Sequence, residues 1–244
     1  MKALNEKTFD PRIKALEKNL KEIKKTVVVC GPKGGVGKSS LATVLALLLS
    51  QQKTTGLFDL DFHNSSSITL LGAEEFFPEE EKGVKPPEVK NLKFMSINYY
   101  VKQKPCVLRG SEVTDAFLEL FTITKWGRLD FLVIDSPPGL GDAFLDLLRF
   151  LKDPEFLLVT TGSILSVNAV KKLLFLLDEL NFKVIGVVNN FKDNFPKITE
   201  AKVKEKLVGE ISFDPDFEKA VGDPEKLLRT RFAYEVKKQV LPML

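Results

Sequence analysis

Residues 26–50 read TVVVCGPKGGVGKSSLATVLALLLS and combine three features in order. A β-branched run predicts a strand at 26–30, the glycine-rich segment predicts a loop, and the apolar stretch after it predicts a helix over 38–52. This order is the setting of a phosphate-binding loop, in which backbone N–H groups and the positive end of a helix converge on phosphate oxygens. The stretch therefore predicts a nucleotide-binding α/β fold.

The loop supplies the groups that phosphate binding needs. Its glycines leave room for backbone N–H groups to approach an anion, because glycine carries no Cβ. We expect Lys38 to place its charge on the β- and γ-phosphates and the Ser39 hydroxyl to bind Mg²⁺. Pro32 breaks the common pattern GxxxxGK[ST], because it stands where the first glycine would be. The predicted nucleotide contacts in this segment are Gly34, Gly35, Val36, Gly37, Lys38, Ser39 and Ser40.

The rest of the chain alternates apolar runs with helical stretches. Strands are predicted at 56–60, 92–97, 131–135, 155–161 and 183–189, and helices at 66–72, 111–122, 142–151, 165–180, 197–206 and 230–242. Continuous apolar strands separated by helices indicate a parallel sheet covered on both faces. We therefore predict a three-layer α/β domain of the P-loop NTPase kind, with a mostly parallel sheet. The glutamate-rich segment 74–90 is expected to be a solvated loop.

The first 25 residues predict a separate amphipathic helix ahead of a domain at 26–244. Asp10 can cap this helix and Pro11 suits its first position. Its apolar positions, at spacings of three, four and three, are Ile13, Leu16, Leu20 and Ile23. Two interpretations remain open at this point: the helix packs on its own domain, or it binds a partner through residues 10–24.

Composition narrows the class of protein. The chain has 244 residues, of which 44% are hydrophobic and 28% charged, which is typical of one ordinary folded domain. Its longest nearly apolar run, Leu41–Leu49, is about half of the ~18 residues that a membrane span needs, and its charged start is unlike a signal peptide. We therefore expect a cytoplasmic protein.

The charge distribution and the small number of cysteines and histidines exclude two further classes, namely nucleic-acid-binding proteins and proteins with a zinc or iron–sulfur site within one chain. The net charge is +3, of which residues 1–25 carry eight basic minus four acidic groups, so the remainder carries −1. This distribution is not that of a nucleic-acid-binding protein. Cys30, Cys106 and the single histidine, His63, are too few for a zinc or iron–sulfur site within one chain.

Carboxylates stand at the ends of two predicted strands. Asp59 and Asp61 lie two residues apart and can face the same way, and Asp135 ends the apolar run FLVID. A carboxylate at the tip of such a strand occupies the Walker-B position beside Mg²⁺. The glycines of segment 136–142 give this loop the freedom of a switch that responds to a γ-phosphate.

A second lysine in the loop, Lys33, stands directly before the glycine pair, and in this the segment resembles the deviant phosphate loop of the Mrp/MinD/ParA ATPases. The resemblance implies ATP and Mg²⁺ as cofactors and an ATP-dependent homodimer in which Lys33 reaches the partner's nucleotide. It implies that Asp61 orients the attacking water, so that the catalytic residues are Lys33, Lys38 and Asp61. It also implies that Ser39, Asp59 and Asp135 hold Mg²⁺, the carboxylates through water.

Later segments resemble the Mrp branch in particular. DSPPGLGD, VLRGSEV, WGRLDFLVID, VTTG and GVVNN occur between residues 107 and 190. The resemblance implies that Asn190 contacts the adenine edge and that Ser212, Phe213 and Asp214 pack around the base. Ser212 departs from the proline usual at its position. No match to the CPxC pair of Mrp cluster carriers occurs between residues 191 and 244.

Three functions follow from the resemblance. As a whole the chain is most similar to the Mrp/MinD-type HypB factor, which implies nickel insertion into [NiFe]-hydrogenase with a nickel chaperone of the HypA type docked on residues 10–24. The second is an iron–sulfur cluster carrier that uses Cys106 in place of the missing pair. The third is a positioning ATPase of the MinD or ParA type. We expect no nucleic-acid binding, because of the charge distribution, and no stable membrane association, because the terminal helix at 230–242 has only a short apolar stripe.

Overall fold

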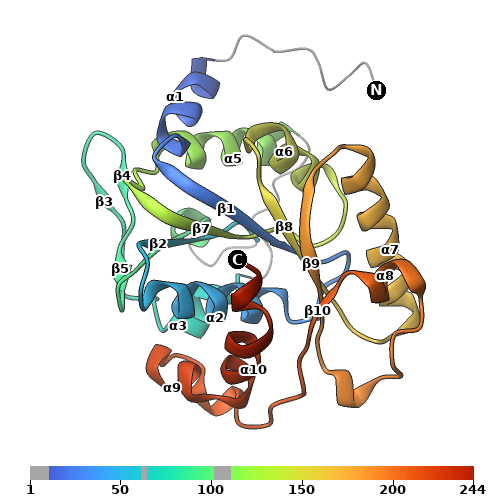
Figure 1. Ribbon diagram of the computed structural model, residues 1–244. Coiled ribbons are helices and arrows are strands. Elements are labelled where there is room, and N and C mark those ends of the chain that lie inside the picture. The colour runs from blue at the N-terminus through green and yellow to red at the C-terminus, as the bar shows by residue number, and fades with distance from the viewer. Residues whose placement is uncertain (1–10, 62–64, 102–110) are drawn as a thin grey trace.

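The computed structural model describes residues 11–61, 65–101 and 111–244 (Figure 1). Predictions made for Asp10, His63 and Cys106, and for the segment around Arg109, lie outside the described residues. None of the helices in the described ranges is long and apolar enough to cross a bilayer.

A twisted sheet forms the centre of the molecule. Within the described ranges it has eight strands in the order β10-β9-β8-β1-β7-β2-β6-β5, and every neighbouring pair is parallel except β5 and β6. The strands are β1 (Ile23–Cys30), β2 (Thr55–Asp59), β5 (Glu88–Val89), β6 (Leu92–Ser96), β7 (Leu129–Asp135), β8 (Glu155–Thr160), β9 (Lys183–Asn189) and β10 (Leu207–Glu210). A separate hairpin joins β3 (Glu79–Glu80) to β4 (Val84–Lys85).

Helices cover both faces of the sheet (Figure 1). One face carries α1 (Pro11–Leu20), α5 (Ser111–Ile123), α6 (Asp142–Phe150), α7 (Ile164–Glu179) and α8 (Ala201–Glu205). The other carries α2 (Lys38–Ser50), α3 (Ser67–Leu71), α9 (Pro224–Arg229) and α10 (Arg231–Gln239). The short α4 (Asn98–Val101) follows β6, and single 3₁₀ turns lie at Lys192–Asn194, Glu218–Ala220 and Leu241–Met243. The predicted three-layer α/β fold with a mostly parallel sheet is confirmed.

The amino-terminal helix is shorter than predicted. It ends at Leu20, and Ile23, expected on its apolar seam, instead begins β1 and pairs in register with Leu129. Lys24 and Lys25 are compatible with a strand here because each finds a carboxylate at the sheet's amino edge, Asp130 and Glu155 respectively. The division of the chain between residues 25 and 26 stays a prediction.

The helix α1 packs on its own chain. Leu16 is 1% exposed and belongs to the apolar core on that face. Arg12 forms an ion pair of 2.8 Å with Asp115 of α5, and the Asn19 side chain donates a hydrogen bond to the Thr122 carbonyl. The apolar side of α1 is therefore covered within the molecule.

Two other segments differ from the sequence-based expectation. The predicted solvated loop at 74–90 contains β3, β4 and β5, of which β5 extends the main sheet by antiparallel pairing with β6. The predicted helix at 230–242 begins with α10 at Arg231, and α9 precedes it as a separate helix capped by Asp223. In the segment 74–90, the glutamate side chains of β3 and β5 are exposed to solvent, which is why the composition of this segment is that of a loop.

Candidate functional site

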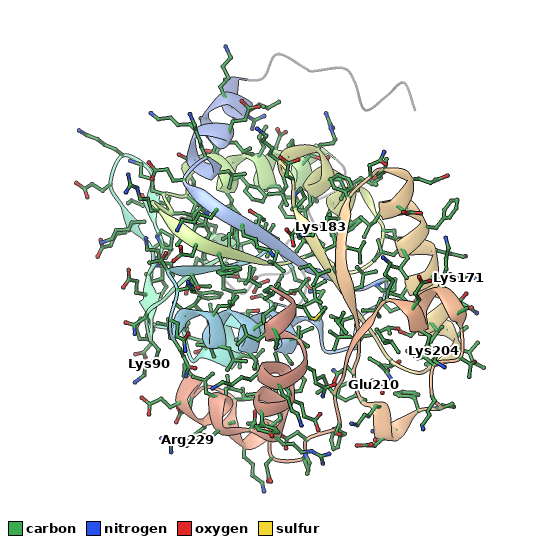
Figure 2. All side chains as sticks on the ribbon, viewed as in Figure 1. Lys90, Lys171, Lys183, Lys204, Glu210 and Arg229 are labelled. Atoms are coloured by element: carbon green, nitrogen blue, oxygen red, sulfur yellow. The ribbon has the colours of Figure 1, made fainter. Side chains whose placement is uncertain are left out.

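Most charged side chains of this protein lie on its outer surface. Lys90, Lys171 and Lys183, labelled in Figure 2, have exposed side-chain fractions of 58%, 50% and 68%. Six charged residues of the described ranges are buried instead, namely Lys38, Asp59, Asp61, Asp135, Asp146 and Asp214. Because a buried charge is costly unless it is paired, the place where four of these gather is a candidate functional site.

A cleft of about 740 Å³ opens there, at the carboxyl ends of the central strands; Lys38 and Asp61 line it, whereas Asp59 and Asp135 are buried and do not. Its wall includes these predicted site residues: Lys33, Gly34, Gly35, Gly37, Lys38, Ser39, Ser40, Asp61, Asn190, Phe213 and Asp214. It also includes Pro138 of the predicted switch segment 136–142, and these residues that the sequence did not indicate: Ser65, Ser66, Thr69, Leu70, Phe191, Pro215, Phe217, Glu218, Val221 and Phe232. In a parallel α/β sheet this edge is where ligands bind.

The phosphate-binding loop has the backbone conformation that its glycines permit. Gly35 and Gly37 have φ angles of +77° and +84°, which side chains with a Cβ rarely adopt. A Cβ at Gly37 would also lie 2.1 Å from Asn190 Nδ2. Gly37 is followed at once by α2, so the first N–H groups of that helix open into the cleft.

Lys38 and Asp135 form a buried ion pair at the base of the loop. The Lys38 Nζ lies 2.5 Å from Asp135 Oδ1, and the two side chains are 6% and 0% exposed. Asp135 ends β7, between β1 and β2, so it reaches the head of α2 from the strand beneath it. Its second oxygen, Oδ2, accepts a hydrogen bond of 3.3 Å from Ser67.

Asp59 lies beside Asp135, because the two residues are register partners in β2 and β7. Asp59 is fully buried and accepts hydrogen bonds from the Asp61 backbone N–H and from the hydroxyls of Ser65 and Ser96. Burial, and next the negative charge of Asp135, raise the pKa of Asp59 above its ordinary value. Two neighbouring buried carboxylates thus share a single buried lysine.

This donor set fits Mg²⁺. Mg²⁺ prefers oxygen ligands, is typically held by one or two carboxylates, and keeps waters or phosphates in its remaining positions. Asp59, Asp135 and the Ser39 hydroxyl are donors of that kind, and a divalent cation would offset the repulsion that raises the pKa of Asp59. Within the described residues no group of three or more His, Cys, Asp or Glu side chains forms a cage of its own.

Asn190 is on the cleft wall, but its amide is engaged with the protein. Its Nδ2 donates a 3.0 Å hydrogen bond to the carbonyl of Val36, and its Oδ1 accepts one from the Phe191 N–H. Val36 itself is buried and contributes this carbonyl rather than a wall of the cleft. The Asn190 amide therefore holds the phosphate-binding loop against the end of β9. The predicted contact of Asn190 with the adenine edge would compete with these hydrogen bonds.

The predicted base-binding residues at 212–214 are only partly brought together at the cleft. Ser212 is 1% exposed. Its hydroxyl accepts a hydrogen bond from Arg231 and its N–H donates one to Glu235, so it holds segment 212–214 from the side away from the cleft. Asp214 lies on the wall, where it accepts the Phe232 N–H and so ties the segment to α10. Phe213 is 48% exposed on the wall. The prediction for Ser212 is corrected: it supports the wall and does not line it.

Of the aromatic part of the cleft, the sequence indicated Phe213 but not Phe191, Phe217 or Phe232. The Phe213 ring lies 6.0 Å from that of Phe191, and Phe217 and Phe232 form an edge-to-face pair at 5.0 Å. These four rings gather from the end of β9, the 213–217 loop and α10. The available signal was that Phe191 directly follows GVVNN and that Phe213 and Phe217 flank a proline turn.

The remaining predicted residues differ in accessibility. Lys33 is exposed at the rim of the cleft, whereas Asp61 is 6% exposed inside it. Cys30, at the end of β1, is 1% exposed, and burial raises the pKa of its thiol. A neutral, inaccessible thiol is a poor metal ligand.

Comparison with known proteins places this site in a family. The family model described as ParA, NUBPL iron-transfer P-loop NTPase, matches residues 22–205. An "iron-sulfur cluster carrier protein" of Aquifex aeolicus is 32% identical over 244 residues, covering 92% of this chain and 67% of the relative. One of the same name from Rickettsia bellii is 32% identical over 192 residues, covering 78% of this chain and 60% of the relative. The chain thus spans about three fifths to two thirds of the length of these relatives.

A solved structure agrees in fold. The nucleotide-binding protein of Archaeoglobus fulgidus, determined in complex with ADP, has a TM-score of 0.74 and 26% sequence identity, with 91% of this chain and 96% of that chain covered.

Proposed function

Because the chain belongs to the ParA family of NUBPL-type iron-transfer P-loop NTPases, we propose that it is an ATP-binding and ATP-hydrolysing switch that serves iron–sulfur cluster delivery. Its cofactors are ATP and Mg²⁺, the pair that the sequence predicts. The observation that carries this proposal is the buried group of Lys38, Asp59 and Asp135 at the head of α2, where Lys38 lines a cleft of about 740 Å³.

Each residue has a role in that chemistry. The loop N–H groups and Lys38 bind the phosphates, and Ser39, Asp59 and Asp135 hold Mg²⁺, which neutralises charge on the phosphates when bound. Asp61, buried inside the cleft, orients the attacking water.

Lys33, exposed at the rim, acts on the nucleotide of a second copy in an ATP-dependent homodimer. A cation supplied in this way is worth roughly 10³ or more in rate.

The names of the relatives support iron–sulfur clusters as the cargo. They do not support the nickel-insertion function, nor a HypA-type partner on residues 10–24. The apolar side of α1 is also taken up by contacts within the chain, so a partner there would meet its charged face. A cluster would need Cys106, shared between two copies, because Cys30 is buried.

The first experiment measures ATP turnover with Mg²⁺. Lys38→Ala should abolish turnover, whereas Lys33→Ala should impair it and leave nucleotide binding largely intact. Turnover retained in Lys38→Ala would contradict the assignment of the phosphate-binding loop.

The second experiment is anaerobic reconstitution with iron and sulfide, followed by absorbance of the cluster. The wild-type protein and the Cys30→Ala control should bind a cluster, and Cys106→Ala should not. No cluster in the wild-type protein, or one that persists in Cys106→Ala, would overturn the proposed cargo. Capture of a nickel chaperone by the ATP-bound protein would favour nickel insertion instead.

A further inference from the structure

Asp135 is held from two sides by different parts of the chain. One oxygen pairs with Lys38, as described above, and the other accepts the hydroxyl of Ser67 at 3.3 Å. Ser67 is the first residue of α3 and is fully buried. A helix on the far side of the cleft therefore touches the carboxylate at the tip of β7.

The Ser67 hydroxyl has a second buried partner. Thr43 Oγ1, in the middle of α2, donates to Ser67 Oγ at 3.1 Å, and Thr43 is also fully buried. A hydroxyl has one proton to donate, so the bond from Thr43 leaves the Ser67 proton directed at Asp135. The three side chains form a relay that starts in α2, passes through α3 and ends on the carboxylate.

The relay differs from ordinary helix packing. Apolar side chains fill most of the interface of α2 with the sheet and α3, and Thr43 is a polar exception among them. A buried serine or threonine can satisfy its hydroxyl on a carbonyl four residues earlier in its own helix. Thr43 instead donates its hydroxyl to Ser67, and Ser67 donates to Asp135.

We propose that Ser67 and Thr43 are positioning residues that fix the orientation of Asp135 for Mg²⁺. This inference rests on the proposed function, since it assigns Mg²⁺ to Asp135. A phosphate would compete with Asp135 for Lys38, and the bond from Ser67 keeps the carboxylate in place if the lysine turns to the phosphate.

The test measures how Mg²⁺ raises the thermal unfolding midpoint at a fixed ADP concentration. For Ser67→Ala we expect the half-maximal Mg²⁺ concentration to rise roughly threefold to tenfold, as the loss of one hydrogen bond of ordinary strength implies. In the presence of ADP without Mg²⁺, the unfolding midpoint of Ser67→Ala should differ from that of the wild type by no more than it does without any ligand. Thr43→Val, which keeps the volume and removes the hydroxyl, should act in the same direction, and Thr43→Ser should restore the wild-type value.

Ser50→Ala is the matched control, because Ser50 is a buried hydroxyl on α2 that bonds only locally, to the Leu47 carbonyl. The relay is refuted if Ser67→Ala and Thr43→Val need the same Mg²⁺ concentration as Ser50→Ala. It is also refuted if both merely lower the midpoint equally at all Mg²⁺ concentrations. If the wild-type midpoint does not respond to Mg²⁺ and ADP at all, the proposed function itself fails, and this inference with it.

Discussion

Removing Lys38 should destabilise the protein even when no nucleotide is present. The lysine is 6% exposed and its partner Asp135 is 0% exposed, at an Nζ–Oδ1 distance of 2.5 Å. Lys38→Ala would leave Asp135 buried without its counter-charge and beside a second buried carboxylate, Asp59. Breaking such a pair by removing one partner typically costs about 3–5 kcal/mol, because the remaining charge stays buried and uncompensated.

Urea unfolding of the nucleotide-free protein measures this cost. A chain of this size has a denaturant slope near the upper end of about 1–3 kcal/mol per molar urea, so a loss of ~3 kcal/mol lowers the midpoint by about 1 M. In a thermal scan the same loss corresponds to roughly 6–12 °C. The double variant with Asp135→Asn should recover much of the loss, because the uncompensated charge is then absent.

Lys33→Ala is the control for this prediction. It removes a lysine from the same loop, but an exposed one, so its effect should stay within about 0.5 kcal/mol. If Lys38→Ala and Lys33→Ala unfold at the same urea concentration, the ion pair does not exist in the nucleotide-free protein. The argument from buried charge would then be wrong.

Three further predictions concern stability without nucleotide. Gly37→Ala should lower the free energy of unfolding by about 1–3 kcal/mol, because the φ of Gly37 is +84° and the added Cβ would lie 2.1 Å from Asn190 Nδ2. Gly34→Ala should not lower it, because a Cβ there would meet no atom within 4 Å. Equal urea midpoints for the two variants would contradict this prediction. Leu16→Ala should cost about 2–5 kcal/mol if α1 is docked as described, and an unchanged midpoint would show that it is not. Asp59→Asn should stabilise the protein more at pH 8 than at pH 5. The raised pKa means that the folded state keeps a proton which the unfolded chain releases as pH rises, so wild-type stability falls with pH and that of the variant does not. A gain independent of pH would refute the cause given.

The part of the site that lies in one continuous segment could be predicted from the sequence. The strand, glycine loop and helix of residues 26–50 follow one another without a gap, so each local preference supports the next. The strand-end carboxylates were equally accessible to prediction, since the carboxyl ends of parallel strands meet at one edge. Both predictions depend on local sequence and on the topology of a parallel sheet.

The contacts that close the cleft could not be predicted in this way. The Asn190 amide reaches Val36 across 154 positions, and Ser67 reaches Asp135 across 68. Ser212 turns inward because Arg231 and Glu235 of α10 hold it there. No periodicity within a single segment carries such information. The first three residues of β1 were missed for a related reason. The apolar spacing of Ile23 placed them on the amino-terminal helix, but Lys24 and Lys25 pair with carboxylates more than 100 positions away in the sheet.

The same ion pair that stabilises the nucleotide-free protein bears on how the switch would work. A phosphate competes with Asp135 for the charge of Lys38, so nucleotide binding under the proposed function weakens the pairing of Lys38 with Asp135. Asp135 would then lose its counter-charge in a site where it is 0% exposed, unless a second cation replaces the lysine. Mg²⁺ bound together with the nucleotide supplies that charge, and Ser67 holds the carboxylate during the exchange. Nucleotide and Mg²⁺ should therefore bind cooperatively, because each offsets the electrostatic cost that the other would meet alone.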